Sequence, residues 1–148
     1  MQSLFRRLSG FFIPNKASEV SLEDHAASES ESTKGCRSMT EKHYNEAIVF
    51  YNKAIELDPN DPFPYYSKAL AYEALGRYQE ALIAADKALK RDPASAIAHN
   101  TKGMALFALG RYREALAEVD MAISFDHTHH EPQNLRDRIL AKLQGGKG

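Results

Sequence analysis

The sequence contains little of what several classes of protein require. It has a single cysteine, Cys36, so it can form neither an internal disulfide nor a zinc site built from several cysteines. No apolar run approaches the roughly 18 to 20 residues that span a bilayer. Lys and Arg number 19 against 20 Asp and Glu, without the basic excess typical of nucleic-acid binders. We therefore predict no transmembrane segment and no nucleic-acid partner.

Signals of catalysis are also missing. The chain has no glycine-rich loop of the kind that cradles phosphate, and Cys36 lies in the least regular part of the sequence. The stretch HTHHE at residues 127–131 has histidines, but it falls between two predicted helices and lacks a helical His pair. We predict an exposed loop there, and for the chain as a whole no catalytic residue, no metal, no cofactor and no enzymatic activity.

What the chain does have is an internal repeat. The stretch ALGRY occurs at residues 74–78 and again at 108–112, and EAL follows each copy at the same offset. The windows 62–95 and 96–129, laid side by side, are identical at 13 positions. In each window two amphipathic helices flank a glycine, Gly76 or Gly110, which suits the left-handed residue after a helix. Such a pair cannot bury its apolar face alone, so the pattern predicts stacked helix pairs.

Period and pattern resemble the tetratricopeptide repeat family, whose units are helix–turn–helix pairs of about 34 residues. The matching positions in the second unit are Tyr65, Ala69, Tyr72, Gly76, Tyr78, Ala81, Ala85, Ala88 and Pro93. The third unit supplies His99, Gly103, Leu106, Gly110, Tyr112, Ala115, Val119 and Ala122. A first unit matches in its second helix through Tyr44, Ala47, Tyr51, Ala54 and Pro59. The first helix of this unit matches the pattern less well. Gly35 aligns with Gly103, but Lys42 replaces the turn glycine.

The resemblance implies an all-α fold, a right-handed superhelical solenoid of antiparallel helix pairs. We expect three units at about 28–61, 62–95 and 96–129. A helix at about 131–143 should cap the last unit, because Leu135, Ile139 and Leu143 form one apolar stripe. Residues 1–27, whose second half is rich in Ser and Glu, are expected to form a flexible tail, as are residues 144–148.

In this family the first helices line a concave surface that holds a peptide or a helix of a partner. We predict a mostly apolar groove and a protein–protein interaction module or adaptor. The predicted groove residues are Phe63, Tyr66, Ser67, Leu70, Glu73, Ile97, Asn100, Thr101, Met104 and Phe107. Core packing is the competing interpretation of the apolar residues. A self-assembling repeat module is the alternative function, because a weak first helix would leave residues 47–55 poorly covered, and a helical-repeat RNA binder is a remote one. The expected state is a monomer or weak dimer.

Members of the family that dock chaperones grip a terminal carboxylate with Lys, Asn, Asn, Lys and Arg. At the matching positions this chain has Ser32, Cys36, Ser67, Ile97 and Thr101, none of which is a cation. A terminal carboxylate would lose its charge-assisted hydrogen bonds there. We therefore predict no carboxylate clamp for chaperone C-termini.

Residues 1–13 are basic and partly apolar, with no acidic residue. Four interpretations stay open for them: a mitochondrial targeting peptide, a membrane-surface anchor, a kinase site at Ser9, or an unstructured terminus. We expect a cytoplasmic protein, with mitochondrial or membrane-surface targeting by residues 1–13 as the alternative.

Overall fold

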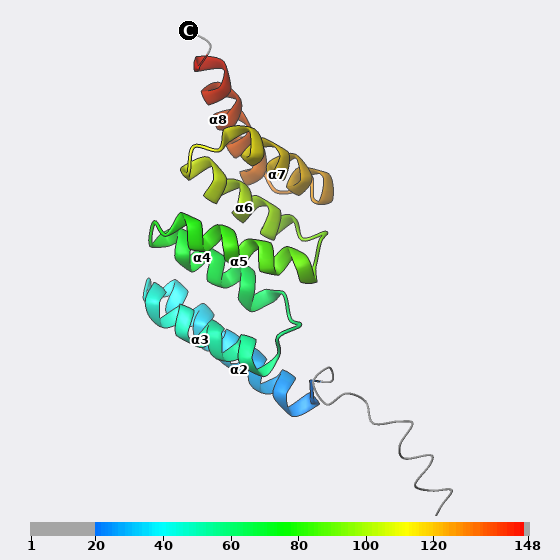
Figure 1. Ribbon diagram of the computed structural model, residues 1–148. Coiled ribbons are helices and arrows are strands. Elements are labelled where there is room, and N and C mark those ends of the chain that lie inside the picture. The colour runs from blue at the N-terminus through cyan, green and yellow to red at the C-terminus, as the bar shows by residue number, and fades with distance from the viewer. Residues whose placement is uncertain (1–19, 147–148) are drawn as a thin grey trace, which may run out of the picture.

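A computed structural model describes residues 20–146 of the chain. Over this range it contains helices and no strand (Figure 1). The helices are α2 (Leu22–Thr40), α3 (Tyr44–Leu57), α4 (Phe63–Ala74), α5 (Tyr78–Arg91), α6 (Ala96–Ala108), α7 (Tyr112–Phe125) and α8 (Glu131–Gly145). They stack as the pairs α2–α3, α4–α5 and α6–α7, followed by α8 at the C-terminal end. The predicted all-α solenoid with three units and a capping helix is confirmed. The interpretations of residues 1–13 fall outside the described residues.

The helix ends follow from local sequence. Ser21 and Ser95 cap α2 and α6, since each side chain accepts a backbone N–H from the first turn. The turn between the two helices is the same in all three pairs. In each turn a backbone N–H donates to a carbonyl five residues earlier, at 2.8 to 2.9 Å. The pairs are His43 to Ser38, Arg77 to Tyr72 and Arg111 to Leu106. These hydrogen bonds close the first helix of each pair in the way that the repeat predicts, with a left-handed residue just after the helix.

Lys42 takes up the turn glycine's role in the first unit. Its φ is +62°, next to +72° at Gly76 and +76° at Gly110. A side chain with a Cβ is disfavoured in this region, so the first unit keeps the repeat's geometry at an energetic cost. The same turn also shows that the first unit is aligned with the others as the sequence predicts.

We expect Lys42→Gly to stabilise the protein by about 1 kcal/mol, because glycine reaches positive φ without the penalty that lysine carries. Urea denaturation followed by circular dichroism measures the change. The matched control is Gly110→Ala, which should destabilise by a similar amount because it creates the same strain where no neighbour lies within 4 Å of the added Cβ. A loss of stability in Lys42→Gly would contradict this account of the turn.

The prediction for residues 22–27 was wrong. They belong to α2, which begins at Leu22, whereas we placed the domain boundary at residue 28 and a flexible tail before it. The cause is a stripe of small residues that faces α3 and replaces an apolar stripe: Ser28, Ser32, Gly35 and Ser38 are all buried. Small residues let two helices approach closely, and the Ser28 hydroxyl donates to the Ala54 carbonyl at 3.0 Å. His25 Nδ1 lies 2.7 Å from Asp58 Oδ2, which ties the early turns of α2 to the loop after α3.

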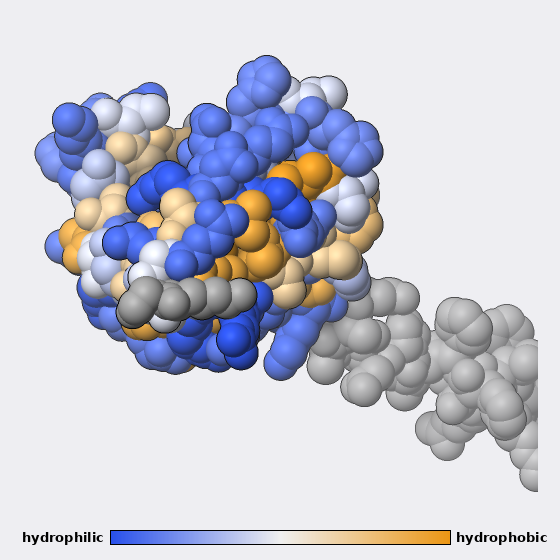
Figure 2. All heavy atoms as spheres, turned by 90° about the horizontal axis from the view of Figure 1, so that it is seen from above, coloured by the Kyte–Doolittle hydropathy of each residue, from blue (hydrophilic) through white to orange (hydrophobic). Residues whose placement is uncertain are grey.

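Helix α2 covers the apolar face of α3. Ala47, Ile48, Tyr51 and Ala54 are at most 8% exposed, so the poorly covered surface that motivated the self-assembly alternative does not exist. At the other end, Leu135 and Ile139 of α8 are buried on the last pair, as predicted. Helix α8 continues to Gly145, past the predicted end at residue 143. Seen from this end, hydrophobic residues show in the middle of the face among hydrophilic ones (Figure 2).

Candidate partner-binding groove

The first helices of the units form the inner side of the solenoid. Helix α2 contacts α4, α4 contacts α6 and α6 contacts α8. Among the described residues the second helices α3, α5 and α7 make no such contacts with one another. The stack is therefore closer on the side of α2, α4, α6 and α8, and these helices line the concave surface.

A pocket of about 290 Å³ occupies the C-terminal half of this surface. Five predicted groove residues line it, and they come from α4 and α6: Leu70, Ile97, Asn100, Thr101 and Met104. Ile97 is 52% exposed, which is unusual for an isoleucine in a packed helix. The structure therefore brings half of the predicted residues together around an open, mainly apolar hollow.

Phe63 lies in a separate hollow. It joins His25, Cys36 and Asp61 around a space of about 470 Å³ in the N-terminal half of the concave surface. Tyr66 stands beside Phe63, with the ring centroids 5.1 Å apart and the planes at 72°. The predicted groove is thus divided into two hollows. Phe63 lines the N-terminal one, and Tyr66 packs against Phe63.

The polar groove residues do not serve as predicted. Thr101 is 1% exposed and its hydroxyl donates to the Ile97 carbonyl at 2.8 Å, so it is occupied within its own helix. Ser67 is 6% exposed. Both are predicted groove residues, but their burial keeps their hydroxyls from a partner's backbone. Asn100 differs, since its side-chain oxygen is buried without a hydrogen-bond partner at the edge of the pocket.

Phe107 is likewise not a free groove residue. It packs against the core cluster of the last pair, and the guanidinium of Arg138 lies over its ring at 4.8 Å from the centroid. Helix α8 therefore covers Phe107 at the C-terminal end of the stack. Phe107 contributes to the seam between α6 and α8.

Sequence reasoning missed the acidic side of the C-terminal pocket. Asp126, Glu131 and Pro132, from the loop before α8 and its first turn, line the pocket. Hydrogen bonds from Thr128 and His129 lower the pKa of Asp126 to about 2, so it is ionised at neutral pH. The repeat could have found Glu131, because it stands one full period after Ile97 and so occupies the same position in a fourth, incomplete unit.

Glu73 adds a second unusual carboxyl on this surface. Burial, and then the negative charge of Glu131, raise the pKa of Glu73 from 4.5 to about 7. One of its carboxyl oxygens is buried with no hydrogen-bond partner. A carboxylate in this state lacks a counter-charge, which a cation from outside the chain would supply.

The histidine-containing loop after α7 forms local contacts. His129 Nδ1 lies 2.7 Å from Asp126 Oδ2, and His130 Nδ1 lies 3.2 Å from Gln133 Oε1. Within residues 20–146 no three His, Cys, Asp or Glu side chains gather in an arrangement that would hold a metal ion. In the same range no helix has the length and apolar character needed to cross a bilayer.

Comparison with known proteins agrees with the geometry. The family model described as "Anaphase-promoting complex, cyclosome, subunit 3", which is of tetratricopeptide type, matches residues 40–122 and so more than half of the chain. The chain belongs to the tetratricopeptide repeat family. Its fold and family are those of a protein-interaction module.

Relatives of this tetratricopeptide repeat chain include the small glutamine-rich tetratricopeptide repeat-containing protein 2 of Mycosarcoma maydis, 40% identical over 55 residues. That match covers 37% of this chain and 16% of the relative. The Arabidopsis OM64 TPR domain is 28% identical with a TM-score of 0.76, over 78% of this chain and 96% of that one. The first TPR domain of human RPAP3 is 24% identical with a TM-score of 0.80, over 84% and 97%. A further structure, 24% identical with a TM-score of 0.79 over 81% and 95%, is the first TPR of Spaghetti (RPAP3) bound to the HSP90 peptide SRMEEVD.

Proposed function

We propose that this protein is an adaptor whose concave surface binds an apolar partner segment that also carries a basic side chain. The observation that carries this proposal is the C-terminal pocket itself. Leu70, Ile97 and Met104 offer apolar surface to a side chain of the partner. Asp126 and Glu131 lie at the same pocket and offer carboxylates to a Lys or Arg.

The charge of the surface opposes the binding of a chaperone tail in this groove. The HSP90 peptide SRMEEVD, which the Spaghetti (RPAP3) domain binds, ends in acidic residues. The turn at Lys42 supports the alignment of the first unit that the repeat predicts. On that alignment we assign the clamp positions to Ser32, Cys36, Ser67, Ile97 and Thr101. With no cation at these five positions and carboxylates nearby, an acidic C-terminus would meet repulsion. A partner without a carboxylate-clamp interaction therefore fits better.

The proposed partner site predicts a specific effect of a single exposed residue. We expect Ile97→Glu to reduce capture of the partner by about tenfold or more, because a charge replaces apolar contact in the lining of the pocket. The full-length chain is used as bait for a cell extract, and captured proteins are compared by quantitative mass spectrometry. Ile97 is 52% exposed, so the substitution should leave the fold intact, which circular dichroism checks.

The matched control places a charge on the outer side of the solenoid. Met121→Glu on α7 changes an apolar residue of similar exposure, 43%, that does not line the pocket. It should retain every protein that Ile97→Glu loses. Partners captured equally by the wild type and by Ile97→Glu would place the binding surface elsewhere and refute the groove proposal.

A monomer or weak dimer, rather than a self-assembling array, remains the oligomeric state that we propose.

A further inference from the structure

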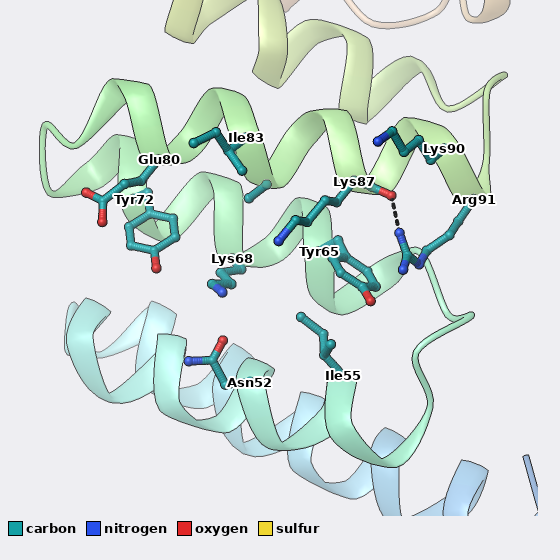
Figure 3. A pocket seen from close by; sticks show the side chains of 11 residues that line it. Asn52, Ile55, Tyr65, Lys68, Tyr72, Glu80, Ile83, Lys87, Lys90 and Arg91 are labelled. Atoms are coloured by element: carbon teal, nitrogen blue, oxygen red, sulfur yellow. Dashed lines mark hydrogen bonds between the residues drawn. The ribbon is translucent and has the colours of Figure 1, made fainter. Parts of the chain in front are cut away.

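A third hollow lies on the opposite side of the solenoid, between α3 and α5 with α4 at its base (Figure 3). We call it the outer cleft, and its volume is about 530 Å³. Four cations line it, namely Lys68, Lys87, Lys90 and Arg91, together with one acid, Glu80. This concentration is local, since the whole chain carries a net charge of −1.

The repeat provides an internal standard for this cleft. Lys102 is the counterpart of Lys68 in the next unit. Its ammonium lies 2.9 Å from Asp86 and 2.7 Å from Glu118, so both of its neighbours in the next cleft are carboxylates. One unit earlier, Asn52 stands at the position of Asp86 and Ala84 at that of Glu118. The outer cleft therefore keeps the lysine and lacks both of its counter-charges.

The other charged groups of the cleft are engaged elsewhere. Glu80 forms an ion pair with Arg77. Arg91 donates to the backbone carbonyls of Pro59 and Lys87, and its guanidinium lies 3.8 Å from the centroid of the Tyr65 ring. The charge of Glu80 favours the ammonium form of Lys68, but Glu80 forms its ion pair with Arg77 and not with a lysine of the cleft.

The lysines themselves remain available to a ligand. Among residues 20–146, no carboxylate lies within ion-pair distance of Lys68, Lys87 or Lys90. Burial, and then the charge of Lys87, lower the pKa of Lys68 against the opposing charge of Glu80. The Lys68 ammonium lies 5.6 Å from the centroid of the Tyr72 ring, but among the described residues it has no carboxylate partner. Figure 3 shows the side chains of Lys68, Lys87 and Asn52 directed into the space between α3 and α5.

We propose that the outer cleft binds an acidic segment of a partner protein, in which neighbouring Asp or Glu residues are followed by an apolar side chain. Its carboxylates take the places that Asp86 and Glu118 hold around Lys102. They pair with Lys68 and Lys87, and the Asn52 amide donates a further hydrogen bond. The apolar side chain packs on Ile83, which is 49% exposed at the cleft.

A membrane or a nucleic acid fits the cleft less well. Either would require a basic surface wider than one cleft, and the lysine of the next cleft is already neutralised by two carboxylates. The inference is independent of the proposed concave site, because the two surfaces involve different helices and opposite charges.

The test uses the full-length protein and an array of synthetic peptides. Each peptide contains two to four Asp or Glu residues and one Leu, Ile or Phe, and has a partner in which Lys replaces each acid. The key variant is Asn52→Asp, Ala84→Glu, which installs both counter-charges around Lys68 and leaves every lysine in place. Because the same arrangement folds around Lys102, the variant should fold, and Lys68 should gain stability from it. Fluorescence anisotropy measures the affinity of the peptides selected on the array.

We expect acidic peptides to bind, their Lys counterparts not to bind, and affinity to fall as salt rises from about 50 to 500 mM. Asn52→Asp, Ala84→Glu and Lys68→Gln, Lys87→Gln should each weaken binding by about tenfold or more. Lys34→Gln, Lys142→Gln removes the same charge from exposed sites on α2 and α8 and should retain binding.

Three results would overturn the proposal. The first is that no acidic peptide binds, and the second is that the double variant Asn52→Asp, Ala84→Glu binds as tightly as the wild type. The third is that the control variant loses as much affinity as the variants of the cleft. Sedimentation of the wild type addresses a different occupant, since self-association abolished by Asn52→Asp, Ala84→Glu would identify a second copy of this chain and refute a separate acidic partner.

Discussion

Gly35→Ala is expected to destabilise the protein by about 2 kcal/mol, although alanine is the better helix former. A Cβ built at Gly35 in α2 would lie 2.6 to 2.9 Å from the ring of Tyr51 in α3. That ring is 1% exposed and is among the largest fully buried side chains, so it has no room to move away. In open space the substitution would stabilise a helix by about 1 kcal/mol. The sign of the measured change therefore reports the contact. Chemical denaturation provides the measurement.

The repeat shows why this contact exists. The Gly35–Tyr51 pair recurs in the second unit as Ala69–Ala85 and in the third as Gly103–Val119. A large side chain on the second helix thus faces glycine, and a small one faces alanine. Gly103 has the same limit, with a built Cβ 2.6 Å from a Val119 methyl group. The sizes of the two facing residues therefore compensate within each pair.

A double-mutant cycle makes the prediction specific. Tyr51→Ala alone should cost about 3 to 5 kcal/mol, since it empties a filled site. On that background Gly35→Ala should no longer destabilise, because the pair then matches Ala69–Ala85. Gly145→Ala at the end of α8, where nothing lies within 4 Å, is the control for a glycine without a neighbour. An unchanged penalty in the Tyr51→Ala background would mean that the strain comes from another contact.

The sequence predicts most of the fold because the repeat carries redundant information. Gly76 and Gly110 locate two turns, and the repeat period then locates the third even though Lys42 replaces its glycine. The first half of α2 was missed for a physical reason. Its buried face consists of serines and a glycine, and helix prediction from apolar periodicity cannot distinguish such a face from a solvated linker. Only the neighbouring α3 gives these small residues their packing role.

The candidate site was predictable in outline and not in detail. Sequence position placed Leu70, Ile97 and Met104 on one surface, and they line one pocket. The sequence does not show that the Thr101 hydroxyl would bond within its own helix, because residue type does not reveal which partner a hydroxyl selects. Nor does it show that α8 would cover Phe107, since that depends on how the last helix packs.

Glu73→Gln is expected to stabilise the protein by between about 1 and 3 kcal/mol above pH 8, and to have little effect near pH 4. The pKa of Glu73 is about 7 in the folded protein against 4.5 in an unfolded chain. The folded state therefore binds more protons than the unfolded state between these values. The contribution of Glu73 to the free energy of unfolding is fully present below pH 4.5 and is lost as pH rises through about 7. Glutamine has no such penalty, so its advantage grows over the same window.

Urea denaturation at pH values from 4 to 9 tests this, with Glu56→Gln on the exposed side of α3 as the control. His25 also has a raised pKa, from its hydrogen bond to Asp58, and its contribution likewise decreases with rising pH. Since His25 is present in the wild type and in both variants, the difference between Glu73→Gln and wild type isolates Glu73. A difference that does not change with pH would show that Glu73 titrates normally.

The two effects of this substitution should then have opposite signs. Glu73 destabilises the free protein at neutral pH because burial and Glu131 oppose its ionisation, and a basic side chain from a partner would relieve that cost. Glu73→Gln should therefore raise stability and at the same time weaken capture of the partner that Ile97→Glu loses. A residue that only filled the core would affect binding through stability, and the two changes would go in the same direction. Opposite directions are the result expected of a carboxylate kept for recognition.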